Sequence, residues 1–137
     1  EAGTQNFASA ATLKPALDFI NLLNDNRLVD YNDKIKDYLL DCFINDPRIR
    51  LYGVPRGTNE DKIPLFSFTV QGVHHEDLAL ILDKMGIAVR SGQMCAEPLM
   101  DRFGVTGMLR ISLAPYNTMQ EAEYFVKCLN KAIDMLI

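Results

Sequence analysis

Cys95 stands in a stretch of sequence that suits a reactive thiol. In GIAVRSGQMCAEP, residues 86–98, glycine and proline flank the cysteine, and Arg90 lies five residues before it. A short helix is predicted over residues 97–103, so Cys95 would precede a helix N-terminus. The partial positive charge at such a terminus favours the thiolate, which is the nucleophilic form of cysteine. At this stage a loop cysteine that only packs under the turn is an equally open interpretation.

The other two cysteines fit apolar helical stripes. Cys42 belongs to the stripe of a helix predicted over residues 29–45, and Cys128 belongs to a similar stripe in the last helix. Unpaired cysteine is among the most buried residue types, so we expect both thiols to be buried. Without a Cys-x-x-Cys pair, the sequence gives little support for a zinc site. Free thiols in a reducing, cytoplasmic setting are the simpler interpretation.

Arg110 is a candidate anion-binding residue. It lies within the strand pattern GMLRISLA, residues 107–114, where alternation places it on one face with Met108 and Ser112. A buried guanidinium needs an anion. That anion is either an Asp or Glu of this chain or the carboxylate of a substrate, which arginine can bind through two parallel hydrogen bonds.

Arg90 and the adjacent histidines have simpler explanations available. The pattern IAVR predicts a brief strand over residues 87–90, and Arg90 at its end is either solvated or folded over toward Cys95. His74 and His75 stand at the start of a helix predicted over residues 75–85. Helix capping explains them better than metal binding or base catalysis, because no other metal ligands accompany them.

The spacing of apolar residues predicts a layered α/β domain of the α+β type. Two helices come first, and Pro15 should kink or break the first of them. Short strands and helices then alternate, which favours a small, mostly antiparallel sheet covered by helices mainly on one face. The predicted helices span residues 5–24, 29–45, 75–85, 97–103 and about 119–135, and the strands 48–54, 63–70, 87–90 and 107–114, with a polar loop over 55–62.

Composition limits the partners of this chain. Its 137 residues, 48% of them hydrophobic, suit one domain with a core. A net charge of -4 without a basic stripe argues against nucleic acid. No apolar run approaches the roughly 18 residues of a membrane span. No signal peptide is visible, and a chain that opens at Glu1 without Met is interpreted as a piece of a longer protein.

The segment GIAVRSGQMCAEPLMDRFGVTGMLRISLAPYNTMQE resembles the C-terminal part of group II (Suf-type) cysteine desulfurases of the class V aminotransferase superfamily. The similarity lies in the cysteine-loop motif from residue 86 to 100, an arginine in a strand, and the pattern S-x-A-x-YNT from Ser112. EAGT, at residues 1–4, resembles the segment that follows the cofactor domain in these enzymes. Many relatives have two histidines before the cysteine, where this chain has Gln93 and Met94.

The resemblance implies that residues 1–137 form the small C-terminal domain of a fold-type I pyridoxal phosphate enzyme. The large domain with the Schiff-base lysine would lie outside this chain, which alone is expected to be inactive. In the family's reaction, Cys95 takes sulfur from L-cysteine as a persulfide, L-alanine is released, and sulfur passes to an acceptor protein for iron–sulfur cluster assembly. The resemblance assigns the substrate carboxylate to Arg110 with Arg90 nearby. It assigns the cofactor phosphate of a partner subunit to Gly3 and Thr4, and it implies a homodimer.

Two other functions stay open at this point. One is a sulfur-carrying or docking domain that works without pyridoxal phosphate. The other is a related selenocysteine lyase or aminotransferase. A Schiff-base lysine encoded upstream of Glu1 would favour an enzyme over a carrier.

Overall fold

The computed structural model describes residues 3–25, 28–53 and 62–137, and nearly all of the loop predicted over 55–62 lies outside these ranges. Within them, helices and strands follow one another in the order that the sequence pattern predicts. The elements are α1 (Phe7–Ala11), α2 (Leu13–Asp25), α3 (Leu28–Asn45), β1 (Ile49–Tyr52), β2 (Leu65–Val70), α4 (His75–Lys84), β3 (Arg90–Gly92), α5 (Glu97–Phe103), β4 (Met108–Ser112) and α6 (Met119–Leu136).

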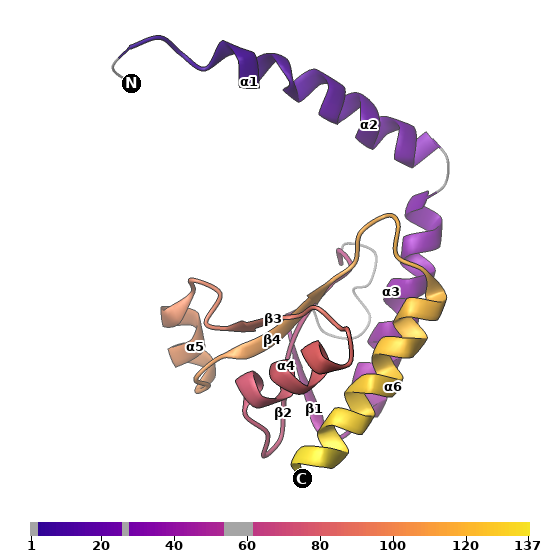
Figure 1. Ribbon diagram of the computed structural model, residues 1–137, viewed down its shortest axis with the longest axis vertical. Helices are drawn as coiled ribbons and strands as arrows, with labels where there is room; N and C mark the ends of the chain where they lie inside the picture. Colours follow the sequence, from indigo (N-terminus) through magenta and orange to yellow (C-terminus); the bar gives the residue numbers. More distant parts are fainter. Residues whose placement is uncertain (1–2, 26–27, 54–61) are drawn as a thin grey trace.

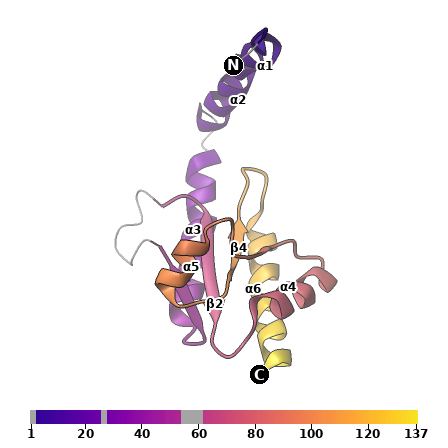
Figure 2. The same ribbon diagram turned by 90° about the vertical axis from the view of Figure 1, so that its left-hand side faces the viewer.

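The four strands form one sheet in the order β1-β2-β4-β3, and each neighbouring pair is antiparallel. Helices α3, α4 and α6 cover one face of this sheet, whereas α5 lies on the opposite side (Figures 1 and 2). The predicted layered fold, with its short antiparallel sheet and helices mainly on one face, is therefore confirmed. The face under α5 is left with little helical cover.

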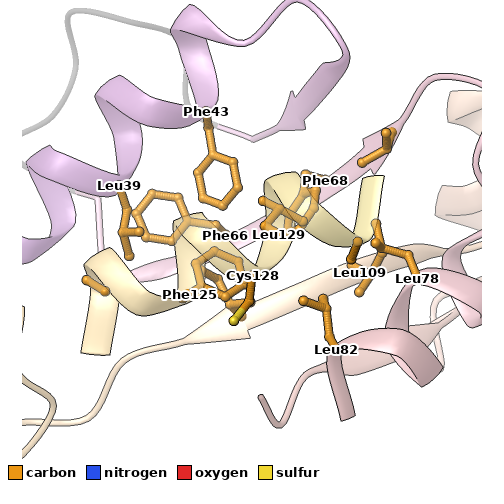
Figure 3. Packing of buried hydrophobic residues seen from close by; sticks show 14 of the residues in the cluster. Leu39, Phe43, Phe66, Phe68, Leu78, Leu82, Leu109, Phe125, Cys128 and Leu129 are labelled. Carbon is orange, nitrogen blue, oxygen red and sulfur yellow. The ribbon is translucent and has the colours of Figure 1, made fainter. Parts of the chain in front are cut away.

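The main core fills the space between the sheet and helices α3, α4 and α6 (Figure 3). Phe43 of α3 packs against Phe66 and Phe68 of β2, with ring centroids 5.3 and 4.8 Å away. Burying a side chain of this size stabilises a fold by about 1.5–3 kcal/mol. Cys128 lies in this core as predicted. Cys42 was predicted to be buried, but it is only half-buried. It lines a surface hollow beside α3.

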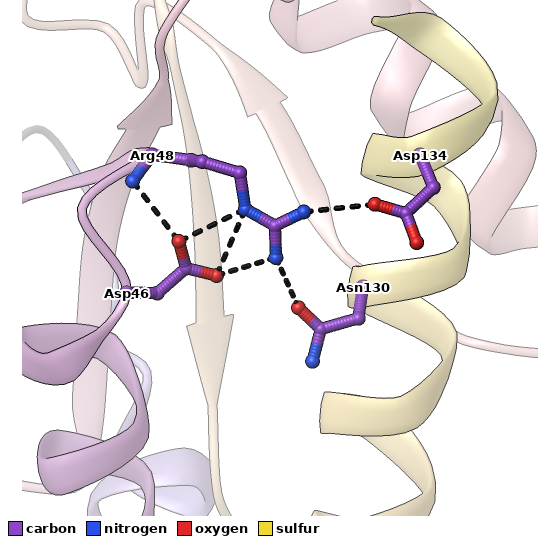
Figure 4. Close-up of polar contacts among 4 residues, drawn as sticks. All are labelled: Asp46, Arg48, Asn130 and Asp134. Carbon is purple, nitrogen blue, oxygen red and sulfur yellow. Dashed lines mark hydrogen bonds and ion pairs between the residues drawn. The ribbon is translucent and has the colours of Figure 1, made fainter.

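Arg48 ties the start of β1 to the last helix (Figure 4). Its guanidinium binds Asp46 with N–O distances of 2.6 to 3.2 Å, and its Nη1 atom lies 2.9 Å from Asp134 of α6. The amide oxygen of Asn130 accepts a further hydrogen bond. The Arg48 side chain holds the pKa of Asp46 below its ordinary value. The turn between α3 and β1 is thereby fixed against α6.

The predicted first helix is present in two pieces. It breaks at Thr12, three residues before Pro15, and Pro15 lies in the first turn of α2, where a missing N–H is tolerated. Both helices extend away from the sheet (Figures 1 and 2). Their apolar side chains are exposed: Phe19 is 59% and Ile20 50% accessible. The helical spacing of the apolar residues correctly predicted a helix here. No other part of the described chain buries the apolar face of that helix.

The strand predicted over residues 87–90 is wrong by three residues, because β3 spans Arg90–Gly92. Gly86 has a positive φ of 78°, and the N–H of Ile87 donates to the Leu82 carbonyl, which completes the end of α4. Residues just after the helix are therefore used to terminate it and to pack on the core. Arg90 consequently begins the strand that it was expected to end.

Candidate active site

Four residues form a row across the whole sheet. Tyr52 of β1 pairs with Ser67 of β2, Ser67 pairs with Arg110 of β4, and Arg110 pairs with Arg90 of β3. Directly opposite residues in antiparallel strands project from the same face. Because Phe66 and its alternating neighbours fill the main core, this row projects from the other face, on the side of α5.

A cavity of about 490 Å³ lies on this face. Tyr52, Lys62, Ser67 and Arg110 supply its polar side chains, and the remaining lining is mainly apolar. Its volume falls in the range of small-molecule sites, which are apolar clefts with a few polar groups. The predicted common face of Met108 and Arg110 is confirmed, since both line this cavity. The other lining residues are Gly53, Ile63, Leu65, Met94, Ala96, Leu99, Met100 and Phe103.

Arg110 lines the cavity and carries an unused hydrogen-bond donor. Its Nε atom is buried and has no hydrogen-bond partner. Within residues 3–25, 28–53 and 62–137, no Asp or Glu forms an ion pair with it. Leaving a buried donor of a charged group unpaired costs free energy. A ligand carboxylate would satisfy this donor, whereas the alternative of an internal acid partner finds no support in the described residues.

Cys95 is presented by a strained turn. The turn spans Gln93 to Ala96 and is closed by a 3.0 Å hydrogen bond from the Ala96 N–H to the Gln93 carbonyl. Its central residues, Met94 and Cys95, have positive φ angles of 59° and 61°. Left-handed backbone costs a residue with a side chain about 1–2 kcal/mol, and such strain gathers at functional sites. The strained turn leaves the Cys95 side chain exposed.

Arg90 reaches this thiol. Its Nη2 atom lies 3.9 Å from Sγ of Cys95, which confirms that the arginine folds toward the cysteine. The predicted helix over residues 97–103 is also confirmed, so Cys95 stands two residues before the first residue of α5. The guanidinium of Arg90 and the N-terminus of α5 therefore both lie close to this thiol.

Comparison with known proteins places this arrangement in a family. Residues 1–125 match the family described as aminotransferase class-V. The chain belongs to this family. A probable cysteine desulfurase of Vibrio cholerae is 38% identical over 99% of this class-V chain, and the cysteine desulfurase CsdA of Escherichia coli is 34% identical over 100% of it. The chain spans about a third of the length of these relatives, 32% and 33%.

Solved structures show the same fold. The class-V chain superposes on the crystal structure of the E. coli cysteine desulfurase CsdA, in its S-sulfonic acid form, with a TM-score of 0.78 at 34% identity. It superposes on the apo cysteine desulfurase of Thermococcus onnurineus with a TM-score of 0.84 at 32% identity. These alignments cover 100% and 99% of this chain, and 33% of each of those chains.

Gly3 and Thr4 of the class-V chain are not brought together with the other candidate residues. Both are exposed, and Gly3 has a positive φ of 108°. They precede α1, at the far end of the helices that extend from the sheet, well away from α5 (Figures 1 and 2). Gly3 and Thr4 therefore cannot contact a cofactor that is bound in the cavity beside Cys95 of the same chain.

The two histidines of the class-V chain differ in role. His74 caps α4 as predicted, since its Nδ1 atom accepts a hydrogen bond from the Glu76 N–H. His75 is buried and bonds to Ser91 of β3, which the sequence did not indicate. Ser67 was also missed, although its alternation with two phenylalanines in LFSFTV could have placed it on the face opposite the core.

The described ranges of the class-V chain hold no group of three or more His, Cys, Asp or Glu side chains placed to bind a metal ion. Nor do they include a helix with the length and apolar character needed to cross a membrane. All three cysteines are free thiols.

Proposed function

We propose that this chain is the sulfur-accepting domain of a pyridoxal-phosphate-dependent cysteine desulfurase. The observation that carries the proposal is the cavity in which an unpaired donor of Arg110 faces the same side of the sheet as the Arg90–Cys95 contact. The similarity to proteins named cysteine desulfurases supports the choice of reaction. The site then needs one anion for Arg110 and one sulfur donor for Cys95.

In this proposal Arg110 binds the carboxylate of L-cysteine. Its side chain already lines the cavity and its Nε atom is buried, so little side-chain ordering remains to be done when substrate binds. A planar guanidinium can hold both carboxylate oxygens, which fixes the direction of the substrate. Ser67, the cross-strand partner of Arg110, supplies a hydroxyl group beside this position.

Cys95 is the proposed sulfur acceptor. Its thiolate attacks the sulfur of L-cysteine, so that an S–S bond forms and the substrate's C–S bond breaks. Overall, one thiol and one L-cysteine give one persulfide and one L-alanine. The carbon that loses sulfur takes up a proton and becomes the methyl group of alanine. Arg90, 3.9 Å from Sγ, stabilises the negative charge on sulfur before and after the transfer.

Pyridoxal phosphate, when bound, supplies an electron sink that weakens the C–S bond. In this proposal the chain's own residues contact the cofactor but do not hold it covalently. Gly3 and Thr4 are exposed and are proposed to contact the cofactor phosphate of a partner subunit. Lys62 lines the cavity, but its amine donates to the Leu65 carbonyl and lies over the Phe66 ring, so it does not serve as the Schiff-base lysine.

The finer biological assignments belong to the same proposal. The persulfide on Cys95 would pass to an acceptor protein for iron–sulfur cluster assembly, since the exposed turn lets a second thiol approach. A homodimer is proposed because the phosphate contacts of residues 3–4 lie far from this subunit's own cavity. A cytoplasmic location agrees with three free thiols.

The test uses the longer protein that carries this domain together with a cofactor-binding domain. Incubation with L-cysteine, followed by peptide mass mapping, should show a gain of one sulfur atom on the peptide that contains Cys95. Cys42→Ser and Cys128→Ser serve as matched controls and should keep the gain. If Cys95→Ser still accumulates protein-bound persulfide and produces alanine at the normal rate, the proposal is wrong.

The chain by itself should neither bind pyridoxal phosphate covalently nor release sulfur from cysteine. Absorbance in the internal-aldimine region, followed by borohydride reduction, tests the first statement, and a sulfide assay tests the second. A stoichiometric, borohydride-trapped adduct on this chain would contradict the proposal that the Schiff-base lysine lies outside it.

A further inference from the structure

His75 lies behind the sheet, on the side away from the two arginines. Its side chain is 9% exposed, and its Nδ1 atom lies 2.8 Å from Oγ of Ser91 in a hydrogen bond that either atom can donate. Ser91 is the central residue of β3, so it projects to the face opposite that of Arg90 and Gly92. The bond therefore links α4 to the strand that leads into the Cys95 turn.

The imidazole ring also reaches the beginning of β4. A Cβ atom on Gly107 would overlap the His75 ring, most closely at Nε2, so this close approach requires glycine. Gly107 directly precedes Met108, the cross-strand partner of Gly92. His75 thus packs against both strands of the β3–β4 pair, at the end where the chain leaves β3 for the turn.

Given the proposed function, we propose that His75 is a positioning residue for Cys95 and acts through Ser91. β3 has three residues and lies at an edge of the sheet, so strand pairing alone is a weak anchor for the Cys95 turn. The partly buried hydrogen bond fixes β3 from behind and thereby fixes the start of the turn. This keeps Sγ of Cys95 within 3.9 Å of the Arg90 guanidinium.

Two alkylating reagents of similar size and different charge can report this position. Iodoacetate is an anion and iodoacetamide is neutral, so a cation beside a thiol raises the ratio of their reaction rates. The 137-residue chain is labelled briefly at neutral pH with each reagent. Peptide mass mapping then gives the rate ratio at Cys95 separately from the rates at Cys42 and Cys128.

Ser91→Ala should lower the iodoacetate-to-iodoacetamide ratio at Cys95 by about threefold, because the thiol and the Arg90 charge separate. His75→Leu should do the same by removing the other partner. Ser91→Thr retains the hydroxyl and should keep the wild-type ratio. His74→Asn is the matched control. It removes a ring that stacks on His75 at 4.4 Å but keeps the cap of α4 and the His75–Ser91 hydrogen bond, so the ratio should not change.

Arg90→Gln separates this inference from the proposed function, because it removes the charge itself. If Arg90→Gln lowers the ratio while Ser91→Ala and His75→Leu leave it unchanged, the positioning role is overturned and the Cys95–Arg90 site stands. If Arg90→Gln has no effect on the ratio, both the proposed Cys95–Arg90 site and the positioning role of His75 are wrong. Faster labelling of Cys42 and Cys128 in Ser91→Ala would indicate general loosening, which also overturns a specific role.

Discussion

Arg90 of β3 and Arg110 of β4 are direct partners in the antiparallel register. Their side chains project from the same face, and like charges in this arrangement repel each other. Among the residues that the structure describes, neither arginine forms an ion pair with an Asp or Glu. The free protein therefore holds two cations side by side, and an anion bound between them would relieve the repulsion.

Arg110→Met should make the free chain more stable by about 0.2–1 kcal/mol, because it removes a like-charge pair and a buried unpaired donor. Equilibrium urea unfolding measures the change. Arg50→Met is the matched control: it removes a charge from β1, but Arg50 lies over the Tyr52 ring, 5.0 Å from its centroid, so stability should fall. A loss of more than about 1 kcal/mol in Arg110→Met would reveal a structural partner for this arginine.

Under the proposed function, Arg110→Ala in a protein that joins this domain to a cofactor-binding domain should raise KM for L-cysteine much more than it lowers kcat. Loss of a charge-assisted pair to the substrate carboxylate should cost about 2–4 kcal/mol in kcat/KM. Steady-state kinetics on Arg110→Ala, with Arg50→Ala as the control at a distant position of the same sheet, measures the effect. Kinetic constants within twofold of wild type would instead make Arg110 a structural residue.

Met94→Asn should stabilise the protein by about 0.5–1 kcal/mol, since asparagine tolerates the left-handed backbone that Met94 adopts at φ 59°. Thermal or urea unfolding measures this gain. Gln93→Asn is the matched control, because Gln93 precedes the two positive-φ residues and should show no gain. Equal stabilities for the two variants would mean that the turn is not strained at Met94.

Acidification should weaken the fold through His75. Burial, helped by the neighbouring His74, lowers the pKa of His75 from its ordinary 6.5, while Glu76 and Asp77 act in the opposite direction with smaller effect. The unfolded chain therefore binds more protons at this site than the folded one. The contribution of His75 to the free energy of unfolding is fully present above about pH 6.5, the ordinary pKa of histidine. It is lost as the pH falls toward the lower pKa of the folded state.

Urea unfolding at several pH values between about 7 and 5 tests this dependence, above the range in which carboxylates dominate. His75→Gln should flatten the pH dependence of the free energy of unfolding. His74→Gln removes only the smaller of the two causes and should flatten the dependence less than His75→Gln does. If wild type and His75→Gln lose stability in parallel on acidification, His75 is not the group responsible.

Residue type and local spacing were enough to single out Cys95 and Arg110 as candidates, and the family resemblance supplied their proposed roles. Cys95 departs from the apolar helical stripes that contain the other cysteines, and Arg110 interrupts an apolar strand. Local pattern also predicted α5 and the last helix, α6, both of which are present. These features depend on neighbouring residues, which a sequence shows directly.

The features that the sequence could not show depend on pairing between distant segments. The row from Tyr52 to Arg90 exists only once the register of four strands is set. The shifted position of β3 depends on how α4 ends, and the role of His75 depends on a strand sixteen residues away. The exposed apolar residues of α2 are a further case, because periodicity reports an apolar face without reporting what covers it.

The order of the strands has a mechanical consequence. The segment that carries Cys95 leaves the sheet from its outermost strand, which is joined to a single neighbour along only three residues. Detaching this margin breaks few hydrogen bonds, whereas the central β2–β4 pair and the phenylalanine cluster beneath it stay intact. Opening at this margin therefore leaves the body of the domain intact, and the His75–Ser91 hydrogen bond is a further contact that such opening must break.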